Sequence, residues 1–268
     1  MKSMTLGSYL PYDSFMHRID PRAKILALLF VLISVFFDAG FLGYLVIALF
    51  TITALKLAKL KTNYILKSVK PMMFMMGFLG VLNIFMLRTG EILITIGNFS
   101  IYTIAITQTL YIVIRLILIV AQTTIVTATT KPLDLTLGIE HLLTPFKKIG
   151  FPAHEVAMMI SIALRFIPTL LEETQRIMKA QASRGVDFNE GTLLEKVNAI
   201  ISLIVPLFIS AFSRAEELAN AMEARCYNPE GKRTRYKQLY WNMKDTLVLS
   251  SSILLVVVIF ILSRLSLW

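Results

Sequence analysis

The sequence predicts an all-α integral membrane protein, and three features of the chain support this fold class. Hydrophobic residues make up 56% of the 268 residues, charged residues make up only 16%, and the net charge is +10. These proportions lie outside those of ordinary soluble domains. A helix needs about 20 mostly apolar residues to cross a bilayer. Five apolar runs approach that length and predict five transmembrane helices, at residues 23–37, 41–57, 72–87, 101–127 and 246–265.

The apolar runs divide the chain into three parts. Residues 1–129 form a membrane domain with four predicted spans, residues 130–245 form a cytoplasmic domain, and residues 246–268 form the last transmembrane helix. The connection between the second and third spans is rich in lysine, with Lys56, Lys59, Lys61, Lys67 and Lys70. Because such loops remain in the cytoplasm, we expect a cytoplasmic N-terminus and an extracellular C-terminus.

A polar leader precedes the first apolar run. Asp20 can cap a helix whose first residue is Pro21, since proline has no N–H to lose at that position. Arg22 and Lys24 are then expected beside the lipid headgroups of the cytoplasmic interface. No small-residue cleavage site follows the first apolar run, so we expect no removed signal peptide.

The third span begins with a cluster of methionines within residues 72–76, next to Gly77 and Gly80. Flexible methionine side chains suit a surface that receives exchangeable partners. The simpler alternative is packed or lipid-facing filler, in which the glycines allow close helix approach. The sequence leaves both alternatives open.

The fourth span contains a polar stripe. Residues 91–105 lead into it and predict either a short hairpin or a loop. Within the span Gln108, Arg115 and Gln122 recur every seven residues and therefore share one helix face. Because a charge in hydrocarbon is costly, this face should point into the bundle. An ion path is one explanation, but no predicted span offers an acidic partner, so structural hydrogen bonding is favoured.

Two long helices are predicted between the fourth and fifth spans, at residues 153–184 and 193–226. Thr192 and Glu195 form a capping box at the start of the second helix. Charges recur along both helices, and the apolar run at residues 200–213 is shorter than a span. We therefore expect amphipathic helices at the cytoplasmic face, bent at Pro168 and Pro206. Entry of residues 200–213 into the bilayer is the alternative.

An arginine ends each long helix. A cation near the negative end of a helix stabilises it by about 0.3 to 1 kcal/mol, which accounts for either Arg184 or Arg225. Small neighbours such as Ser183, Gly185 and Ala224 leave each guanidinium projecting, where it can pair bidentately with a carboxylate or with carbonyls. On chemistry alone, helix capping and docking of a partner are equally supported.

Signatures of catalysis are missing from the sequence. Cys226 is the single cysteine, and the three histidines share no metal-ligand spacing. No glycine-rich phosphate loop, nucleophile elbow or zinc-protease motif occurs. We therefore expect no catalytic, cofactor or metal site, and an ATPase on another chain if ATP drives the protein. A membrane-surface anchor explains the following basic residues better than nucleic acid does: Lys232, Arg233, Arg235 and Lys237.

Several short motifs, in their order and spacing, resemble one known family. They are Asp20-Pro21-Arg22-Ala23-Lys24, Leu164-Arg165-Phe166-Ile167-Pro168, and the paired segments Ser183-Arg184-Gly185 and Ala224-Arg225-Cys226. Over almost its whole length the chain resembles the transmembrane T component of energy-coupling factor transporters, the vitamin-importing branch of the ABC transporters.

The resemblance implies a non-catalytic scaffold in the plasma membrane of a prokaryotic cell. Two ABC ATPase subunits would bind it through Arg184 and Arg225. A small substrate-binding membrane protein, the S component, would lie along the apolar faces of the long coupling helices. ATP-driven movement of the ATPases would then reorient the S component, with Pro168 and Pro206 as candidate hinges.

The chain departs from the family pattern at both arginine segments, where the pattern is Ala-Arg-Gly. Ser183 is a small change. Cys226 is a larger one, because a residue with a Cβ is strained where φ must be positive. The second helix is therefore expected to end differently, near Asn228. The unequal segments favour two different ATPases.

Two other functions stand as alternatives. A conventional ABC importer permease would form its own translocation path, but such permeases dock an ATPase through a short helical loop instead of two long helices. A membrane enzyme acting on a lipid or quinone would use Arg115, or Glu140, His141 and His154, which lack the spacing of an acid–base or metal site.

Overall fold

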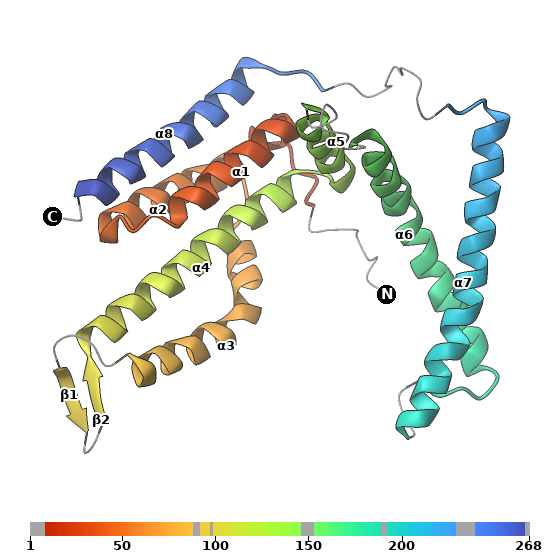
Figure 1. The fold of residues 1–268 in the computed structure, drawn as a ribbon, viewed down its shortest axis with the longest axis horizontal. Helices are drawn as coiled ribbons and strands as arrows, with labels where there is room; N and C mark the ends of the chain where they lie inside the picture. The colour runs from red at the N-terminus through yellow and green to blue at the C-terminus, as the bar shows by residue number, and fades with distance from the viewer. Residues whose placement is uncertain are drawn as a thin grey trace. The chain divides into compact units, whose positions relative to one another are not determined.

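The computed structural model describes residues 9–87, 92–96, 99–145, 153–188, 192–228 and 239–265. The chain folds into two compact units, Met1–Leu142 with Leu239–Trp268 and Leu143–Gln238. The first unit contains α1 (Pro21–Val35), α2 (Gly40–Leu57), α3 (Thr62–Met86), β1 (Ile92–Ile96), β2 (Phe99–Tyr102), α4 (Thr103–Thr129), α5 (Pro132–Leu143) and α8 (Met243–Leu265). The second contains α6 (Ala153–Ala182) and α7 (Leu193–Ala224). The predicted all-α class is confirmed, with one short hairpin beside the helices (Figure 1).

Helices α1 and α8 pack side by side and run in the same direction (Figure 1). At their first turns the Asp20 N–H donates to Asp245 Oδ1 over 2.8 Å. At the other end the rings of Phe37 and Phe260 lie 5.7 Å apart. Ile259 is fully buried in the apolar cluster that these helices share with α2 and α4. A second apolar cluster joins the end of α2 to the end of α4, and the two clusters form the core of the first unit.

Helices α2 and α4 also run parallel, held by polar contacts one heptad apart. Arg115 donates to the Tyr44 hydroxyl through Nε at 3.1 Å and Nη2 at 2.8 Å. Gln122 Nε2 donates to Thr51 Oγ1 at 2.7 Å. Asp38, in the connection before α2, also accepts from Arg115 at 3.0 Å. Arg115 and Gln122 of the polar stripe therefore face α2, which confirms structural hydrogen bonding for both, whereas the prediction was wrong for Gln108, which is exposed.

The start of α1 lies beside the end of α4. Lys24 is only 4% exposed, and its Nζ donates to the Thr129 carbonyl at 3.0 Å and to Thr130 Oγ1 at 2.9 Å. The last carbonyls of a helix lack helical partners and carry partial negative charge, so this cation closes α4. Because Asp20 also contacts Asp245, the start of α1, the end of α4 and the start of α8 share one side of the bundle.

Helix α3 bends along its length in Figure 1 and contains Pro71, which cannot donate the regular helical hydrogen bond. Within the methionine cluster Met76 is buried and residues 73–75 are exposed. A Cβ added at Gly80 would lie 3.1 Å from the Thr109 side chain of α4. Close packing therefore explains Gly80 and Met76. For the exposed residues 73–75, a partner-binding surface and lipid-facing filler both stay open.

The segment before α4 forms a short hairpin, which is one of the two structures that the sequence predicts there. Strands β1 and β2 pair antiparallel, with Ile92 opposite Tyr102 and Ile96 opposite Phe99. Gly97 and Asn98, around which the pattern alternates, lie outside the described residues. The hairpin leads directly into α4.

Among the described residues, five helices are long and apolar enough to cross a membrane: α2, α3, α4, α7 and α8. The number of candidate spans agrees with the prediction, but α1 was predicted and is missing from this set, whereas α7 was not predicted and belongs to it. Helix α1 has 15 residues, or about 22 Å, which is shorter than the hydrocarbon core of about 30 Å. Helix α7 holds an 18-residue window with a mean hydropathy of 1.8. The expectation that α7 is too short in apolar residues was wrong, because Val197 and Ala199 extend its apolar run.

Helices α6 and α7 form an antiparallel pair in the second unit (Figure 1). Contacts at three levels hold the pair: Tyr227 OH with Met158 Sδ at 2.9 Å, Arg214 Nη2 with Glu173 Oε2 at 3.5 Å, and Gln181 Nε2 with the Ser202 carbonyl at 3.1 Å. Thr192 and Glu195 form the predicted capping box at the start of α7. The start of each long helix therefore lies near the end of the other.

Candidate functional site: two arginine tips on long helices

The predicted docking segments lie at the C-terminal ends of α6 and α7 and are named here the first tip and the second tip. The first tip contains Ser183, Arg184 and Gly185, and the second tip contains Ala224, Arg225 and Cys226. Every one of these residues is exposed. Both tips are therefore accessible to another protein.

The first tip is closed by backbone hydrogen bonds. Helix α6 ends at Ala182, and Gly185 adopts a left-handed φ of +87°. The Gly185 N–H donates to the Ala182 carbonyl at 3.0 Å, and the Val186 N–H donates to the Gln181 carbonyl at 3.1 Å. This pair of bonds is the Schellman motif, which satisfies the last carbonyls of a helix. Arg184 is therefore the last residue before the chain turns away from α6 at Gly185, and its side chain projects from the end of the helix.

The second tip has the same local structure. Helix α7 ends at Ala224, and Cys226 adopts a left-handed φ of +55°. The Cys226 N–H donates to the Glu223 carbonyl at 2.8 Å, and the Tyr227 N–H donates to the Met222 carbonyl at 3.0 Å. These bonds have the same spacing as those of the first tip.

The two tips are thus copies of one structure, in which an arginine precedes a residue of positive φ. The expectation that the second helix ends near Asn228 was wrong, because Cys226 accepts the conformation that glycine adopts in the first tip. The left-handed conformation costs an L-residue about 1 to 2 kcal/mol. The two Schellman hydrogen bonds of the second tip offset that strain.

We expect Cys226→Gly to raise the stability of α7 by about 1 kcal/mol, because glycine has no Cβ to strain at this φ. Gly185→Ala should lower the stability of α6 by a similar amount. A Cβ at Gly185 would meet no atom within 4 Å, so the backbone conformation alone decides its effect. Thermal unfolding of the purified chain would measure both, and shifts of the same sign would contradict the prediction.

The tips lie at opposite ends of the α6–α7 pair. The contact between Gln181 and Ser202 puts Arg184 near the level of Ala199 on α7. From there to Arg225 the helix continues for about 26 residues, or roughly 40 Å. Within the described residues, no carboxylate pairs with either guanidinium. The two arginines therefore present separate cations that can each meet a partner.

A proline lies near the middle of each long helix, at the position where the sequence predicts a bend. Pro168 lies inside α6 and Pro206 lies inside α7. Each lacks the N–H that would bond the carbonyl four residues earlier, which belongs to Leu164 or Ser202. Helices bend most readily at such interruptions.

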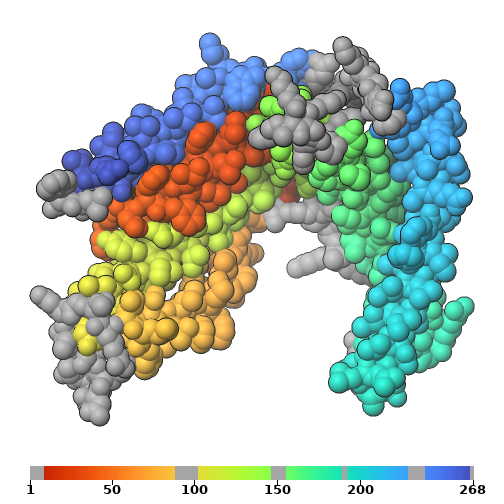
Figure 2. All heavy atoms as spheres, viewed as in Figure 1, coloured from red at the N-terminus to blue at the C-terminus, as the bar shows by residue number. Residues whose placement is uncertain are grey.

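Helix α7 carries a long exposed apolar face, called here the α7 stripe. It consists of Leu193, Leu194, Val197, Ile200, Ile201, Ile204, Val205, Phe208, Ile209 and Phe212. Figure 2 shows side chains of α7 at the surface of the second unit, from the start of the helix to its end. Contiguous apolar surface of this extent marks contact with a membrane or with another protein.

Arg214 and Glu173 link the middles of α6 and α7. Arg214 lines a mostly apolar cavity of about 230 Å³ between the helices. Its Nη2 lies 3.5 Å from Glu173 Oε2, and Arg176 Nη1 lies 3.8 Å from the same oxygen. The sequence shows these charges on amphipathic helices but not which of them meet. That pairing depends on how the helices cross.

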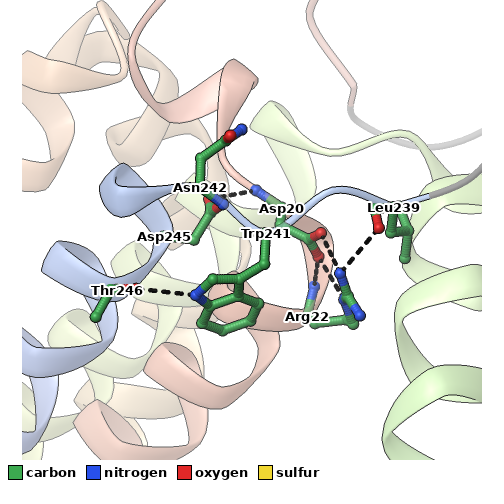
Figure 3. Close-up of polar contacts among 7 residues, drawn as sticks. All are labelled: Asp20, Arg22, Leu239, Trp241, Asn242, Asp245 and Thr246. Carbon is green, nitrogen blue, oxygen red and sulfur yellow. Dashed lines mark hydrogen bonds and ion pairs between the residues drawn. The ribbon is translucent and has the colours of Figure 1, made fainter.

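The Asp20-Pro21-Arg22 motif closes the start of α1 (Figure 3). Asp20 Oδ1 accepts the Arg22 N–H at 2.8 Å, which is the predicted helix cap. The Arg22 guanidinium pairs with the same carboxylate at 2.9 Å, donates to the Leu239 carbonyl at 3.3 Å, and lies 5.6 Å from the Trp241 ring centre. Both side chains bind groups within the protein, and Lys24 is buried, so it does not project toward lipid headgroups. The predicted position of this end of α1 at the cytoplasmic interface stays a prediction.

Asp245 joins the start of α8 to the start of α1 (Figure 3). Its side chain accepts the Asp20 N–H at 2.8 Å and the Asn242 N–H at 2.7 Å, and the residue is only 1% exposed. A buried carboxylate with two backbone donors is strongly held. Asp20 and Asp245 are 225 positions apart, so no local sequence pattern indicated this contact.

The structure describes the side chains of three residues of the enzyme alternative: Arg115, Glu140 and His141. His141 is exposed on α5, whereas its neighbour Glu140 is buried. Arg115 is engaged with Tyr44, and the His154 side chain lies outside the described residues. In the described ranges no group of three or more His, Cys, Asp or Glu residues is placed to hold a metal ion.

Comparisons with known proteins agree with the organisation found above. The family model CbiQ, described as "Cobalt transport protein", matches residues 13–236. "Energy-coupling factor transporter transmembrane protein EcfT" of Bacillus subtilis (strain 168) is 45% identical over 262 residues, covering 98% of this chain and 99% of that protein. The protein of the same name from Lactococcus lactis subsp. cremoris (strain MG1363) is 40% identical over 266 residues, covering 99% and 100%. The chain therefore belongs to the EcfT family and is a multi-pass transmembrane component of an energy-coupling factor transporter.

Proposed function

We propose that this chain is the scaffold that couples two ABC ATPase subunits to a small substrate-binding membrane protein, the S component. The proposal is carried by the two tips, which repeat one backbone structure and present one exposed arginine each. Two equal handles roughly 40 Å apart suit two similar partners better than one shared partner. The chain adds no catalytic group of its own, and the ATPases hydrolyse the ATP.

Docking of the ATPases would use the guanidinium groups of Arg184 and Arg225. A guanidinium presents a planar fork of donors that fits a carboxylate or a pair of carbonyls. The small residues Ser183 and Ala224 and the sharp turn at Gly185 or Cys226 leave room for the walls of an acceptor groove. Truncating one partner of a buried charge pair at an interface costs about 2 to 5 kcal/mol. Each tip can therefore hold an ATPase firmly.

Coupling would proceed through the α6–α7 pair. ATP binding and hydrolysis bring ATPase subunits together and apart, and the tips would follow that movement. The α6–α7 pair would switch between two crossing angles, with Pro168 and Pro206 as its hinges. The α7 stripe would carry the movement to the S component, whose apolar surface it is suited to contact.

The topology that we propose has five spans: α1, α2, α3, α4 and α8. The end of α4 and the start of α8 share one side of the bundle, so the chain between them crosses the membrane an even number of times. Helix α6 is not among the span-capable helices, and α7 alone would make the number odd. This parity supports α6 and α7 remaining on one side, with the α7 stripe against the S component or the bilayer surface.

Helix α1 is proposed as a span although it has only 15 residues. It runs alongside α8 from first turn to last, and Phe36 and Phe37 extend its apolar length. The lysines after α2 are exposed, which supports a cytoplasmic position for that connection. The N-terminus would then lie in the cytoplasm and the C-terminus outside the cell, in the plasma membrane of a prokaryote.

The cargo that we propose is a vitamin or another micronutrient, chosen by the S component. The matching family model is described as a cobalt transport protein, and cobalt is itself a micronutrient. The α7 stripe is apolar and lacks the convergent polar groups of a small-molecule site. Recognition of the cargo by another chain agrees with that surface.

Stoichiometry tests this function against the permease alternative. The tagged chain would be purified in mild detergent, and the intact complex would be weighed by native mass spectrometry. We expect one copy of this chain with two ATPase subunits and one further small membrane protein. Two copies of the chain with two ATPases would establish the permease instead and would overturn the scaffold.

A further inference from the structure

Gln181 lies where the first tip meets α7, and it makes two kinds of hydrogen bond. Its backbone carbonyl accepts the Arg184 N–H at 3.0 Å and the Val186 N–H at 3.1 Å, and so closes the tip. Its side-chain Nε2 donates to the Ser202 carbonyl of α7 at 3.1 Å. One residue therefore holds the first tip and contacts the second helix.

The Ser202 carbonyl is the acceptor that Pro206 leaves without its helical donor. In a regular helix the N–H of residue 206 would bond this oxygen, but proline has no N–H. A polar group left without a partner away from water destabilises a fold by about 1 to 3 kcal/mol. The Gln181 amide supplies the missing donor from the other helix.

We infer that Gln181 is a positioning residue that links the first arginine tip to the hydrogen-bond interruption at Pro206 of α7. A displacement of the Arg184 backbone displaces the Gln181 turn, and with it the donor that satisfies Ser202. The geometry of α7 at Pro206 therefore responds to the position of the tip. This inference rests on the proposed function, in which an ATPase moves the tip.

The link belongs to the first tip alone. The residue equivalent to Gln181 in the second tip is Met222, whose carbonyl accepts the Arg225 N–H at 3.1 Å and the Tyr227 N–H at 3.0 Å. A methionine side chain has no hydrogen to donate, and Met222 instead lines the cavity between the helices. A displacement of the first tip therefore acts on the other helix through a side-chain hydrogen bond, whereas a displacement of the second tip acts through the apolar packing of Met222.

A double-mutant cycle tests the bond. Gln181→Leu should lower the unfolding temperature of the purified full chain by about 2 to 4 °C, which corresponds to about 1 kcal/mol in a chain of this size. In a Pro206→Ala background the same change should have almost no effect, because the backbone N–H that alanine brings restores the helical partner of Ser202. Equal losses in both backgrounds would overturn the inference.

Matched variants keep the cycle interpretable. Gln181→Glu has the shape of glutamine without the donor, and it should behave as Gln181→Leu does. Pro168→Ala removes the proline of the other helix, so its effect should simply add to that of Gln181→Leu. Gln175→Leu changes an exposed glutamine of α6 and should leave the unfolding temperature unchanged.

A distance measurement in the assembled transporter tests the transmission. Spin labels would be attached at Lys179→Cys and Ser213→Cys, both exposed and outside the tips and the α7 stripe, in a Cys226→Gly background that keeps the left-handed turn of the second tip. Adding ATP with Mg²⁺ should shift the label distance when Gln181 is present and leave it unchanged in Gln181→Leu. An equal shift in both would overturn the transmission role. Loss of the ATPases from the complex in Arg184 and Arg225 variants is a separate result, which bears on the proposed function alone.

Discussion

Replacing both Arg184 and Arg225 with glutamate is expected to abolish the association with the ATPases, and with it ATP-driven import. Each change reverses a charge at an exposed tip and removes the guanidinium fork. Loss of about 2 to 5 kcal/mol at one tip weakens binding by roughly 30-fold to several thousand-fold. The tips lie roughly 40 Å apart, so their effects should add. Mass spectrometry of the ATPase subunits recovered with the tagged chain would measure the loss.

The control for charge reversal is Lys179→Glu, an exposed cation on the last turns of α6 that lies outside the first tip. It changes the net charge by the same amount as Arg184→Glu and should leave ATPase recovery unchanged. Each single arginine variant should retain a weakened complex, because the other tip still binds. Wild-type recovery from the double glutamate variant would show that the tips do not dock the ATPases.

Arginine-to-lysine changes distinguish helix capping from partner docking, the two roles that the sequence supports equally. Lysine keeps the positive charge beside the helix end, so helix stabilisation of about 0.3 to 1 kcal/mol remains. It lacks the bidentate fork that docking requires. Arg184→Lys with Arg225→Lys should therefore preserve the unfolding temperature but weaken ATPase binding. Preserved binding would favour capping as the role of both arginines.

Local features of the fold could be predicted from the sequence because neighbouring residues determine them. Asp20 caps α1, Thr192 and Glu195 form a capping box, and Gly185 ends α6 in the left-handed region. Each depends on a few consecutive residues and on backbone groups at a helix end. The predicted tips lie at helix ends for the same reason.

Other features could not be predicted from the sequence. Helix lengths are one example, because α1 has only 15 residues whereas α7 holds an 18-residue apolar window. The positive φ of Cys226 was missed for another reason, because the hydrogen bonds of a helix end can impose a conformation that the residue type disfavours. The partner of Ser202 could not be inferred either, because Gln181 reaches it only when α6 and α7 cross as they do.

The second large effect is expected at Asp245, where Asp245→Ala should lower the stability of the chain by about 2 to 5 kcal/mol. Removing the carboxylate leaves the N–H groups of Asp20 and Asn242 without their acceptor in a site that is almost fully buried. Each unpaired buried donor costs about 1 to 3 kcal/mol. Thermal unfolding of the purified chain in detergent would measure the loss, and hydrogen exchange should show the starts of α1 and α8 opening together.

Two carboxylate variants make this prediction specific. Asp245→Asn keeps one acceptor oxygen but not the charge, so it should have a smaller effect than Asp245→Ala. Asp13→Asn is the control, because the Asp13 carboxylate is exposed and pairs with Arg18 at the surface. The hydrogen bond and charge of Arg18 hold the pKa of Asp13 below its ordinary value, but exposed pairs of this kind contribute little to stability. Equal stability of the Asp245→Ala and Asp13→Asn variants would mean that α8 is held to α1 by apolar packing alone, since the carboxylate bridge would then make no measurable contribution.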